Sequence, residues 1–291
     1  MTFDRALCSL RRTQLRFSQA SARPLAAVRK GTRVTITESV STTLPSGDAW
    51  VGATGTKFTR RLGIAASIGI GWLIGFGLLF SPADRIQDDA VRILYVHVPS
   101  VWLAYLAFIV TAISSAAYLF KRTSSMTWDR LAGASAEIGV VFIAITLISG
   151  SLWGRITWGV YWVWDSRLTT TAFLFVTYIG YLAVRRLGGT HQQRAKRSAV
   201  LALLAVLEIP LVHFSVKLWR PLHQDATVAN PNGDVKIDGL MLFSLLVGVI
   251  AFTMLYVWLL IHRQRILTME DIVDDHSLDQ ALAERRQEVQ R

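Results

Sequence analysis

Six apolar runs, each close to the length of a membrane-spanning helix, constrain this chain more than any other feature. They cover residues 62–80, 101–120, 131–152, 168–184, 199–216 and 240–261. Of the 291 residues, 52% are hydrophobic and only 18% are charged, a composition that favours the membrane class. A bilayer core needs roughly 20 helical residues, so the short fourth and fifth runs must extend into flanking polar residues. Because lipid cannot satisfy exposed backbone groups, the sequence predicts an all-α integral membrane protein, a bundle of six transmembrane helices.

The positive charges alternate between the two sets of loops. Within residues 56–266, the loops before the first run, between the second and third, after the fourth and after the sixth carry 13 Lys and Arg, and the opposite set carries seven. Basic residues are enriched in cytoplasmic loops, so we expect both termini in the cytoplasm and the loop at 153–167 on the external face. We therefore attribute the net charge of +11 to the orientation of the chain in the membrane and to contact with membrane lipid. We expect no nucleic-acid partner.

The chain divides by composition into three parts. Residues 1–55 are expected to form a disordered basic extension, which could be an organelle transit segment, a cytoplasmic tail or sequence upstream of the true start. Residues 56–266 are expected to form the membrane domain, and residues 267–291 a charged cytoplasmic tail. The single cysteine, Cys8, excludes an internal disulfide, and the sequence has no Cys-x-x-Cys-His haem-attachment motif.

A tryptophan-rich segment lies between the third and fourth runs. It reads Trp153-Gly-Arg-Ile-Thr-Trp158-Gly-Val-Tyr-Trp162-Val-Trp164-Asp165. If it is helical, one face carries Trp158, Tyr161, Trp162 and Asp165. Indole rings at the membrane surface can be a simple aromatic belt, or a platform for a flat ligand. The density of four tryptophans closed by a carboxylate keeps both readings open.

Two histidines are expected on the same face as the tryptophans. His97 precedes the second run, and His223 follows the fifth. Imidazoles on opposite sides of a flat macrocycle would give a six-coordinate haem iron, and this reading competes with a structural role for each histidine. His213, within the fifth run, is expected to form hydrogen bonds in the bundle interior. Glu137 and Glu208 also lie within runs and receive no role.

The quoted segments resemble a known family. The tryptophan-rich segment, continued by Arg167-Leu168-Thr169, is similar to the signature of the haem-handling proteins. The flanking segments Tyr95-x-His97-Val-Pro99, Ile209-Pro210-x-x-His213 and Leu222-His223-Gln224 resemble those of the cytochrome c maturation protein C family. The resemblance covers about 62–265 in order and spacing. The long N-terminal segment departs from the family pattern, which leaves the start or the compartment open.

The resemblance implies a haem-handling subunit and not an enzyme. It implies that haem b is held transiently at the external face between His97 and His223 as axial ligands of the iron. Trp153, Trp158, Trp162, Trp164 and Asp165 match the platform and docking surface, and we expect Arg167 to contact a haem propionate. The implied partners are a membrane-anchored haem chaperone, the subunits of an ABC transporter and a small single-span subunit.

The resemblance also implies a location and leaves rivals. We expect a multi-pass protein of the bacterial inner membrane, or of the mitochondrial inner membrane if the N-terminal extension is a transit segment. One rival is a haem–cytochrome c ligase of the same superfamily, against which six spans with short loops argue. A haem-translocating permease is a second rival, and a structural subunit with aromatic anchors is a third.

Overall fold

The computed structural model describes residues 55–84, 87–219 and 239–290, and the elements in these ranges are helices. They are α3 (Lys57–Trp72), the π-helix η2 (Leu73–Phe80), the 3-10 helix η3 (Asp89–Ile93), α4 (Leu94–Leu119), α5 (Met126–Trp158), α6 (Ser166–Arg186), α7 (His191–Ala205), α8 (Glu208–Trp219) and α9 (Gly239–Val289). The predictions for residues 1–54 and for His223 fall outside the described residues.

Six helical spans in the described residues are long and apolar enough to cross a membrane, which confirms the predicted helical membrane class. They are Lys57–Phe80, Asp89–Leu119, Met126–Trp158, Ser166–Arg186, His191–Trp219 and Gly239–Val289. The fourth and fifth spans do extend into polar residues, as their short apolar runs required. The last helix continues without a break far beyond the apolar run, and its side chains from Val273 to Val289 are exposed.

Polar residues at the helix starts explain where the spans begin. The Thr56 hydroxyl accepts a hydrogen bond from the Thr59 backbone N–H at 3.2 Å, and Thr190 forms a reciprocal capping box with Gln193 at the start of α7. Such caps satisfy N–H groups that have no partner within the helix. The chain can therefore reverse direction in short loops at the ends of the apolar runs.

The fifth span is not one continuous helix. It is interrupted at Val206 and Leu207, between α7 and α8. Pro210 lies in the first turn of α8, where a missing backbone N–H costs little. The break leaves the Glu208 side chain at the start of a half-helix, where the positive end of the helix dipole favours a carboxylate.

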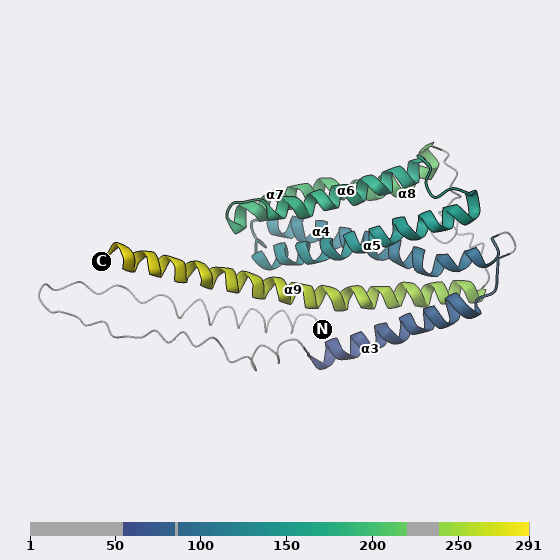
Figure 1. The fold of residues 1–291 in the computed structure, drawn as a ribbon, viewed down its shortest axis with the longest axis horizontal. Helices are drawn as coiled ribbons and strands as arrows, with labels where there is room; N and C mark the ends of the chain where they lie inside the picture. Colours follow the sequence, from purple (N-terminus) through teal and green to yellow (C-terminus); the bar gives the residue numbers. More distant parts are fainter. Residues whose placement is uncertain (1–54, 85–86, 220–238, 291) are drawn as a thin grey trace, which may run out of the picture. The chain divides into compact units, whose positions relative to one another are not determined.

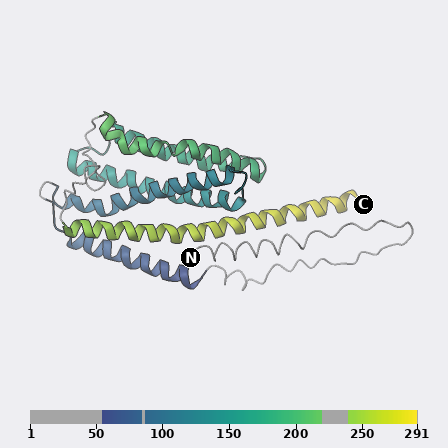
Figure 2. The same cartoon turned by 180° about the vertical axis from the view of Figure 1, so that it is seen from behind.

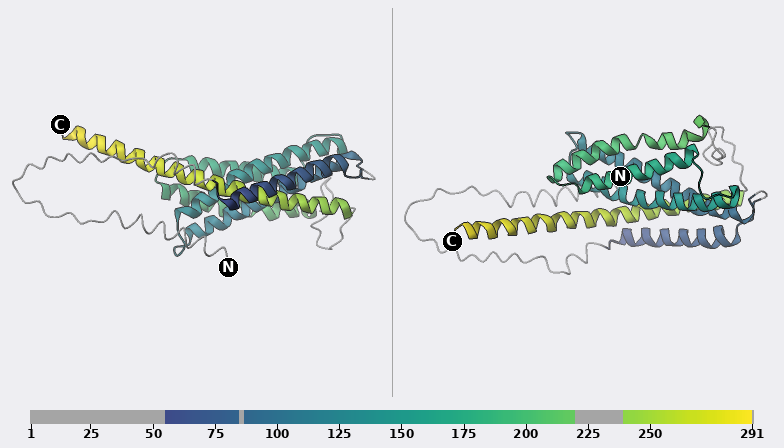
Figure 3. Two further views of the ribbon diagram at one scale, coloured as in Figure 1. Left: turned by 90° about the horizontal axis from the view of Figure 1, so that it is seen from below. Right: turned by 45° about the horizontal axis from the view of Figure 1, so that its top comes forward.

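The helices pack around α4 and α5. Helices α6 and α7 contact this pair on one side and α9 contacts it on the other, while α3 lies against α9 (Figures 1 and 2). The right-hand view of Figure 3 shows the same order. We call the end at which α4 begins and α5 ends the tryptophan end, and the other the opposite end. Helices α6 and α9 begin at the tryptophan end, and α8 ends there. Two hydrogen bonds show this arrangement: Ser166 on α6 donates to Ser215 on α8, and Trp102 on α4 donates to Thr253 on α9.

The interior of the bundle combines small residues, aromatic rings and hydroxyl pairs. The rings of Phe108 on α4 and Tyr178 on α6 stack at 3.6 Å between centroids. Gly139 on α5 lies against Phe108, and a Cβ atom there would come within 2.4 Å of the ring. The hydroxyls of Ser135 and Tyr256 hydrogen-bond at 2.7 Å between α5 and α9. Helices in lipid have no hydrophobic driving force to associate, so close backbone approach and hydrogen bonds between helices stabilise the bundle.

Candidate functional site

His97 lies in the first turn of α4, at the tryptophan end. Its imidazole ring packs on α5, where a Cβ atom at Gly150 would come within 3.1 Å of His97 Cε1. Gly150 therefore leaves the room that the ring occupies. The ring of Trp153, one turn further along α5, meets the imidazole edge-on at 5.8 Å between centroids. The structure thus brings together two of the residues that were predicted to form the site.

A serine on α5 holds the near side of this imidazole. His97 Nδ1 and Ser149 Oγ are hydrogen-bonded at 2.9 Å. Ser149 is 7% exposed. A histidine that binds a metal usually engages its other ring nitrogen in such a bond. The sequence analysis did not identify this partner. The signal that could have indicated it is the Ser-Gly pair just before Trp153, at the end of an apolar run.

Trp153 is held from the loop that precedes α4. Its indole Nε1–H donates to Gln87 Oε1 at 3.0 Å. The Gln87 backbone N–H in turn donates to Asp84 Oδ1 at 2.9 Å. Arg92 anchors the same loop by donating to the carbonyl oxygens of Leu78 and Ser81, at 3.2 and 3.1 Å. Trp153 is therefore a fixed, partly buried wall beside His97.

The tryptophan-rich segment is not a single helix, and the predicted shared face of Trp158, Trp162 and Asp165 is wrong. Helix α5 ends at Trp158, because Gly159 adopts a left-handed conformation with φ of 77° and caps the helix. The chain then runs without helical structure until α6 begins at Ser166. The Arg155 guanidinium donates to the Gly159 carbonyl and lies over the Tyr161 ring, 5.6 Å from its centroid.

The remaining tryptophans are on this loop and its borders, with their rings partly or largely outside the packed core. Trp164 is 83% exposed and Trp158 is 36% exposed. The rings of Trp162 and Trp164 meet edge-on at 5.6 Å between centroids. Ser151 fixes the loop by donating to the Tyr161 carbonyl at 2.7 Å. A flat apolar ligand would find indole surface here that the bundle itself does not bury.

Asp165 has a structural task that sequence reasoning missed. It is the N-cap of α6, and its Oδ1 accepts the Leu168 backbone N–H at 2.8 Å. The carboxylate sits at the positive end of the helix dipole, which stabilises its charge. The capping pattern, an Asp three residues before the apolar run at Leu168, was the signal that could have shown it.

Arg167 follows in the first turn of α6 and is half-buried. It lies near enough to Tyr105 on α4 and His213 on α8 to interact with both electrostatically. Its charge therefore acts on residues of both neighbouring helices at the tryptophan end. A cation in that place can attract a carboxylate ligand such as a haem propionate.

His213 does not lie in the bundle interior, and that prediction is wrong. Its side chain is exposed, and its ring meets the ring of Phe214 edge-on at 5.0 Å. Helix α8 packs chiefly on α6 and buries Ile209, Val212 and Ser215, a stripe from which His213 is displaced. His223 lies beyond the end of α8, outside the described residues.

The two acidic residues within the spans have different surroundings. Glu137 on α5 accepts hydrogen bonds from the Arg263 guanidinium on α9, with a distance of 3.1 Å from Nη2 to Oε1. Glu208 accepts from Thr177 at 2.9 Å through Oε1, and its buried Oε2 has no hydrogen-bond partner among the described residues. Neither belongs to the site around His97.

Comparison with known proteins extends the likeness over most of the chain. The family model described as "Heme exporter protein C" matches residues 46–278. Heme exporter protein C of Bradyrhizobium diazoefficiens is 38% identical over 211 residues, which are 69% of this chain and 79% of that protein. The Haemophilus influenzae protein of the same name is 32% identical over 212 residues, 72% and 82% of the two chains. A ccmC-like mitochondrial protein of Arabidopsis thaliana, named for cytochrome c biosynthesis, is 33% identical over 189 residues, 65% and 70% of the two chains.

Proposed function

Because this chain belongs to the heme exporter protein C family, we propose that it holds haem at the tryptophan end and delivers it to a haem chaperone. Haem b is then a transient cargo and not a resident cofactor. The acceptor is a membrane-anchored chaperone that carries haem to cytochrome c. In this proposal the protein is a handling subunit and catalyses no covalent step.

The observation that carries this proposal is the setting of His97. Its Nδ1 side is held on α5 by Ser149, while Trp153 stands edge-on beside the ring. Imidazole fixed through one nitrogen suits iron ligation through the other. His223 would supply the second axial ligand from the segment that follows α8.

The loop residues divide the remaining tasks. Trp158, Trp162 and Trp164 offer indole surface to the porphyrin and to the chaperone. Arg167, close to Tyr105 and His213, would pair with a propionate. Asp165 fixes the point at which the loop joins α6 by capping that helix. Its contribution to docking would therefore include holding the indoles in place.

We propose that the tryptophan end faces the external side of the membrane and that both termini are cytoplasmic. The charge of the loops supports this orientation, since the basic set borders the opposite end. The membrane is the bacterial inner membrane, or the mitochondrial inner membrane if residues 1–55 are a transit segment. An ABC transporter and a small single-span subunit would be the partners within the membrane.

The ligation is tested on purified protein loaded with haem. We expect the absorption spectrum of low-spin haem, and we expect His97→Ala and His223→Ala each to replace it by a high-spin spectrum. His276→Ala, in the exposed part of α9, is the matched control and should leave the spectrum as it is. A low-spin spectrum that persists in both site variants would overturn the assignment of the ligands.

The orientation is tested by labelling intact cells or spheroplasts with a membrane-impermeant maleimide. Cys8 is first replaced by serine, so that each variant has one cysteine. Trp164→Cys reports the tryptophan end, and Thr123→Cys, in the exposed loop between α4 and α5, reports the opposite end. We expect label on Trp164→Cys alone, and the reverse result would contradict the proposed topology.

A further inference from the structure

We propose that Ser149 is a positioning residue that fixes the tautomer of His97. In this tautomer the proton is on Nδ1 and donates to Ser149 Oγ, so that Nε2 carries the lone pair that iron requires. The inference rests on the proposed function for its purpose. The tautomer itself is a property of the protein without haem and can be measured there.

The hydroxyl proton of Ser149 has an acceptor on its own helix. A hydroxyl has one proton to donate and can accept through its oxygen at the same time. Ser149 Oγ lies 2.8 Å from the Ile145 carbonyl oxygen and 3.2 Å from that of Thr146, both on its own helix. A serine in a helix commonly donates to the carbonyl four residues before it. When Ser149 does so, only its oxygen faces His97 Nδ1, and Nδ1 must be the donor.

The orientation of the His97 ring is fixed by its contacts with α5. The 3.1 Å separation between a Cβ built at Gly150 and His97 Cε1 means that the Nδ1–Cε1 edge of the imidazole lies directly on α5. Trp153 stands edge-on at 5.8 Å between centroids. A ring flip would exchange the positions of ring carbon and nitrogen and break the 2.9 Å bond to Ser149. The helix surface and the hydroxyl therefore select one orientation together.

The chemical type of the partner affects how basic the His97 imidazole is. Carboxylate partners raise the basicity of a ligating imidazole, whereas a hydroxyl oxygen is neutral and polarises the N–H less. Ser149 can thus set which nitrogen faces the iron without making the imidazole a strongly basic ligand. This suits a site from which haem must leave.

The tautomer is measured first in the haem-free protein, by NMR of 15N-labelled histidine in detergent. The signals of His97 are identified from their absence in His97→Ala. We expect the shifts of an imidazole protonated on Nδ1 in the wild-type protein, and a mixture of tautomers in Ser149→Ala. A wild-type His97 protonated on Nε2 overturns the proposal, whether or not any variant folds.

Haem binding is measured second, by titrating hemin into the same proteins. We expect Ser149→Ala to weaken binding about tenfold, the lower end of the range for loss of a partner of a metal ligand. Ser149→Thr retains the hydroxyl and should restore the wild-type affinity. Thr146→Val is the matched control, because Thr146 is also buried and, among the described residues, its hydroxyl donates within its own helix, to the Phe142 carbonyl at 2.8 Å. We expect it to bind hemin as the wild type does.

The two measurements separate this inference from the proposed function. If His97→Ala loses the low-spin spectrum while Ser149→Ala changes neither the tautomer nor the affinity, the positioning role is wrong and the ligand assignment stands. If His97→Ala keeps the low-spin spectrum, the assignment of His97 as a ligand is wrong. In that case the NMR shifts still decide whether Ser149 sets the tautomer.

Discussion

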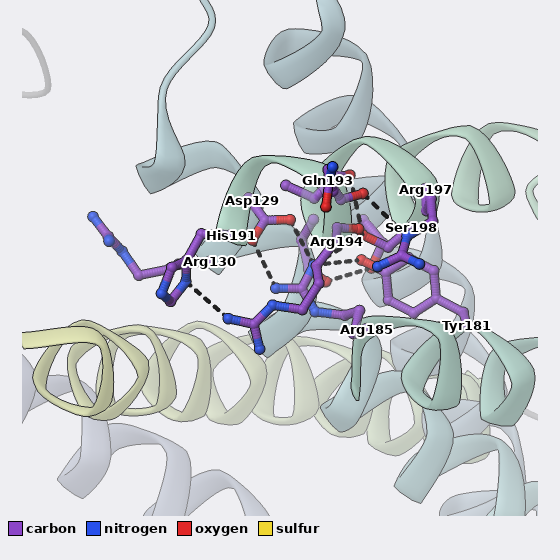
Figure 4. Close-up of polar contacts among 12 residues, drawn as sticks. Asp129, Arg130, Tyr181, Arg185, His191, Gln193, Arg194, Arg197 and Ser198 are labelled. Carbon is purple, nitrogen blue, oxygen red and sulfur yellow. Dashed lines mark hydrogen bonds and ion pairs between the residues drawn. The ribbon is translucent and has the colours of Figure 1, made fainter. Parts of the chain in front are cut away.

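The two ends of this bundle differ in the side chains that connect their helices. At the opposite end, charged side chains from different helices pair with one another (Figure 4). Arg185 on α6 donates to both carboxylate oxygens of Asp129 on α5, at 2.6 and 2.8 Å, and its Nη1 also lies 3.4 Å from the Tyr181 and Ser198 hydroxyl oxygens. Arg130 donates to Asp271 at 2.9 Å and ties α5 to α9. These ion pairs connect α5 to α6 and to α9.

At the tryptophan end, the contacts around His97 are hydrogen bonds between neutral side chains, and aromatic surface stays outside the core. These are the His97–Ser149 and Trp153–Gln87 bonds, while the Asp165 carboxylate caps its own helix, α6. Trp164 keeps 83% of its surface exposed. We therefore expect substitutions at the opposite end to act mainly on stability, and those at the tryptophan end to act mainly on the proposed binding and transfer of haem. Four substitutions test that separation, from the largest expected effect on stability to the smallest.

Arg185→Met should produce the largest loss of stability. It leaves the Asp129 carboxylate, 10% exposed, without its cation. Removing one partner of a buried pair costs about 3–5 kcal/mol. The free energy of unfolding is followed by circular dichroism during detergent denaturation, with the exposed Arg186→Met as control. The double variant Asp129→Leu with Arg185→Met should recover much of the loss, and a double variant as unstable as the single one would contradict the explanation.

Asp165→Ala should cost about 1 kcal/mol, because α6 loses its N-cap. Asp165→Asn can cap equally well and should keep the stability of the wild type in the same denaturation assay. The pair also sharpens the comparison of the two ends. If Asp165→Asn keeps the stability of the wild type and yet fails to deliver haem to the chaperone, the charge of Asp165 serves docking in addition to the cap. Equal losses of stability in both variants would argue against capping.

Gln87→Leu should lower the free energy of unfolding by up to about 1 kcal/mol, the value of one hydrogen bond. Trp153 would then lose the acceptor of its indole N–H. Since Trp153 borders His97, we also expect a broader absorption band of the bound haem. Gln192→Leu, exposed at the opposite end, is the control for stability. An unchanged band in Gln87→Leu would show that the loop does not position this wall of the site.

Trp164→Ala should have the smallest effect on stability, less than about 0.5 kcal/mol, because an exposed side chain is removed. Its expected effect lies in transfer of haem to the chaperone, measured as the rate at which the chaperone acquires haem absorbance. Trp219→Ala, also exposed at 58% and at the same end, is the matched control. Equal rates for Trp164→Ala, Trp219→Ala and the wild type would remove Trp164 from the docking surface.

Some features of this protein could be read from the order of its residues. The six apolar runs predict the six spans, because hydrogen bonding within each helix is the only way for a single chain segment to cross lipid. The two short runs had to extend, and they do so into Ser166 and His191. The tryptophan-rich segment and its neighbours pointed to the family that the comparisons support.

Other features depended on local conformation that periodicity does not reveal. A helical repeat placed Trp158, Trp162 and Asp165 on one face, but the left-handed Gly159 ends the helix between them. His213 appeared interior because its run is apolar. Helix α8, however, packs mainly on one neighbour and leaves that position exposed.

The sequence by itself determined that six segments of this chain are long and apolar enough to cross a membrane, and which residue types lie between them, because both follow from lengths and composition along the chain. Only the tertiary structure decided the partners. Ser149 meets His97, Gln87 meets Trp153 and Arg263 meets Glu137 across separations of 52, 66 and 126 residues. Each partnership depends on how neighbouring helices are rotated and shifted against one another, and the pattern within a single helix contains no information on that.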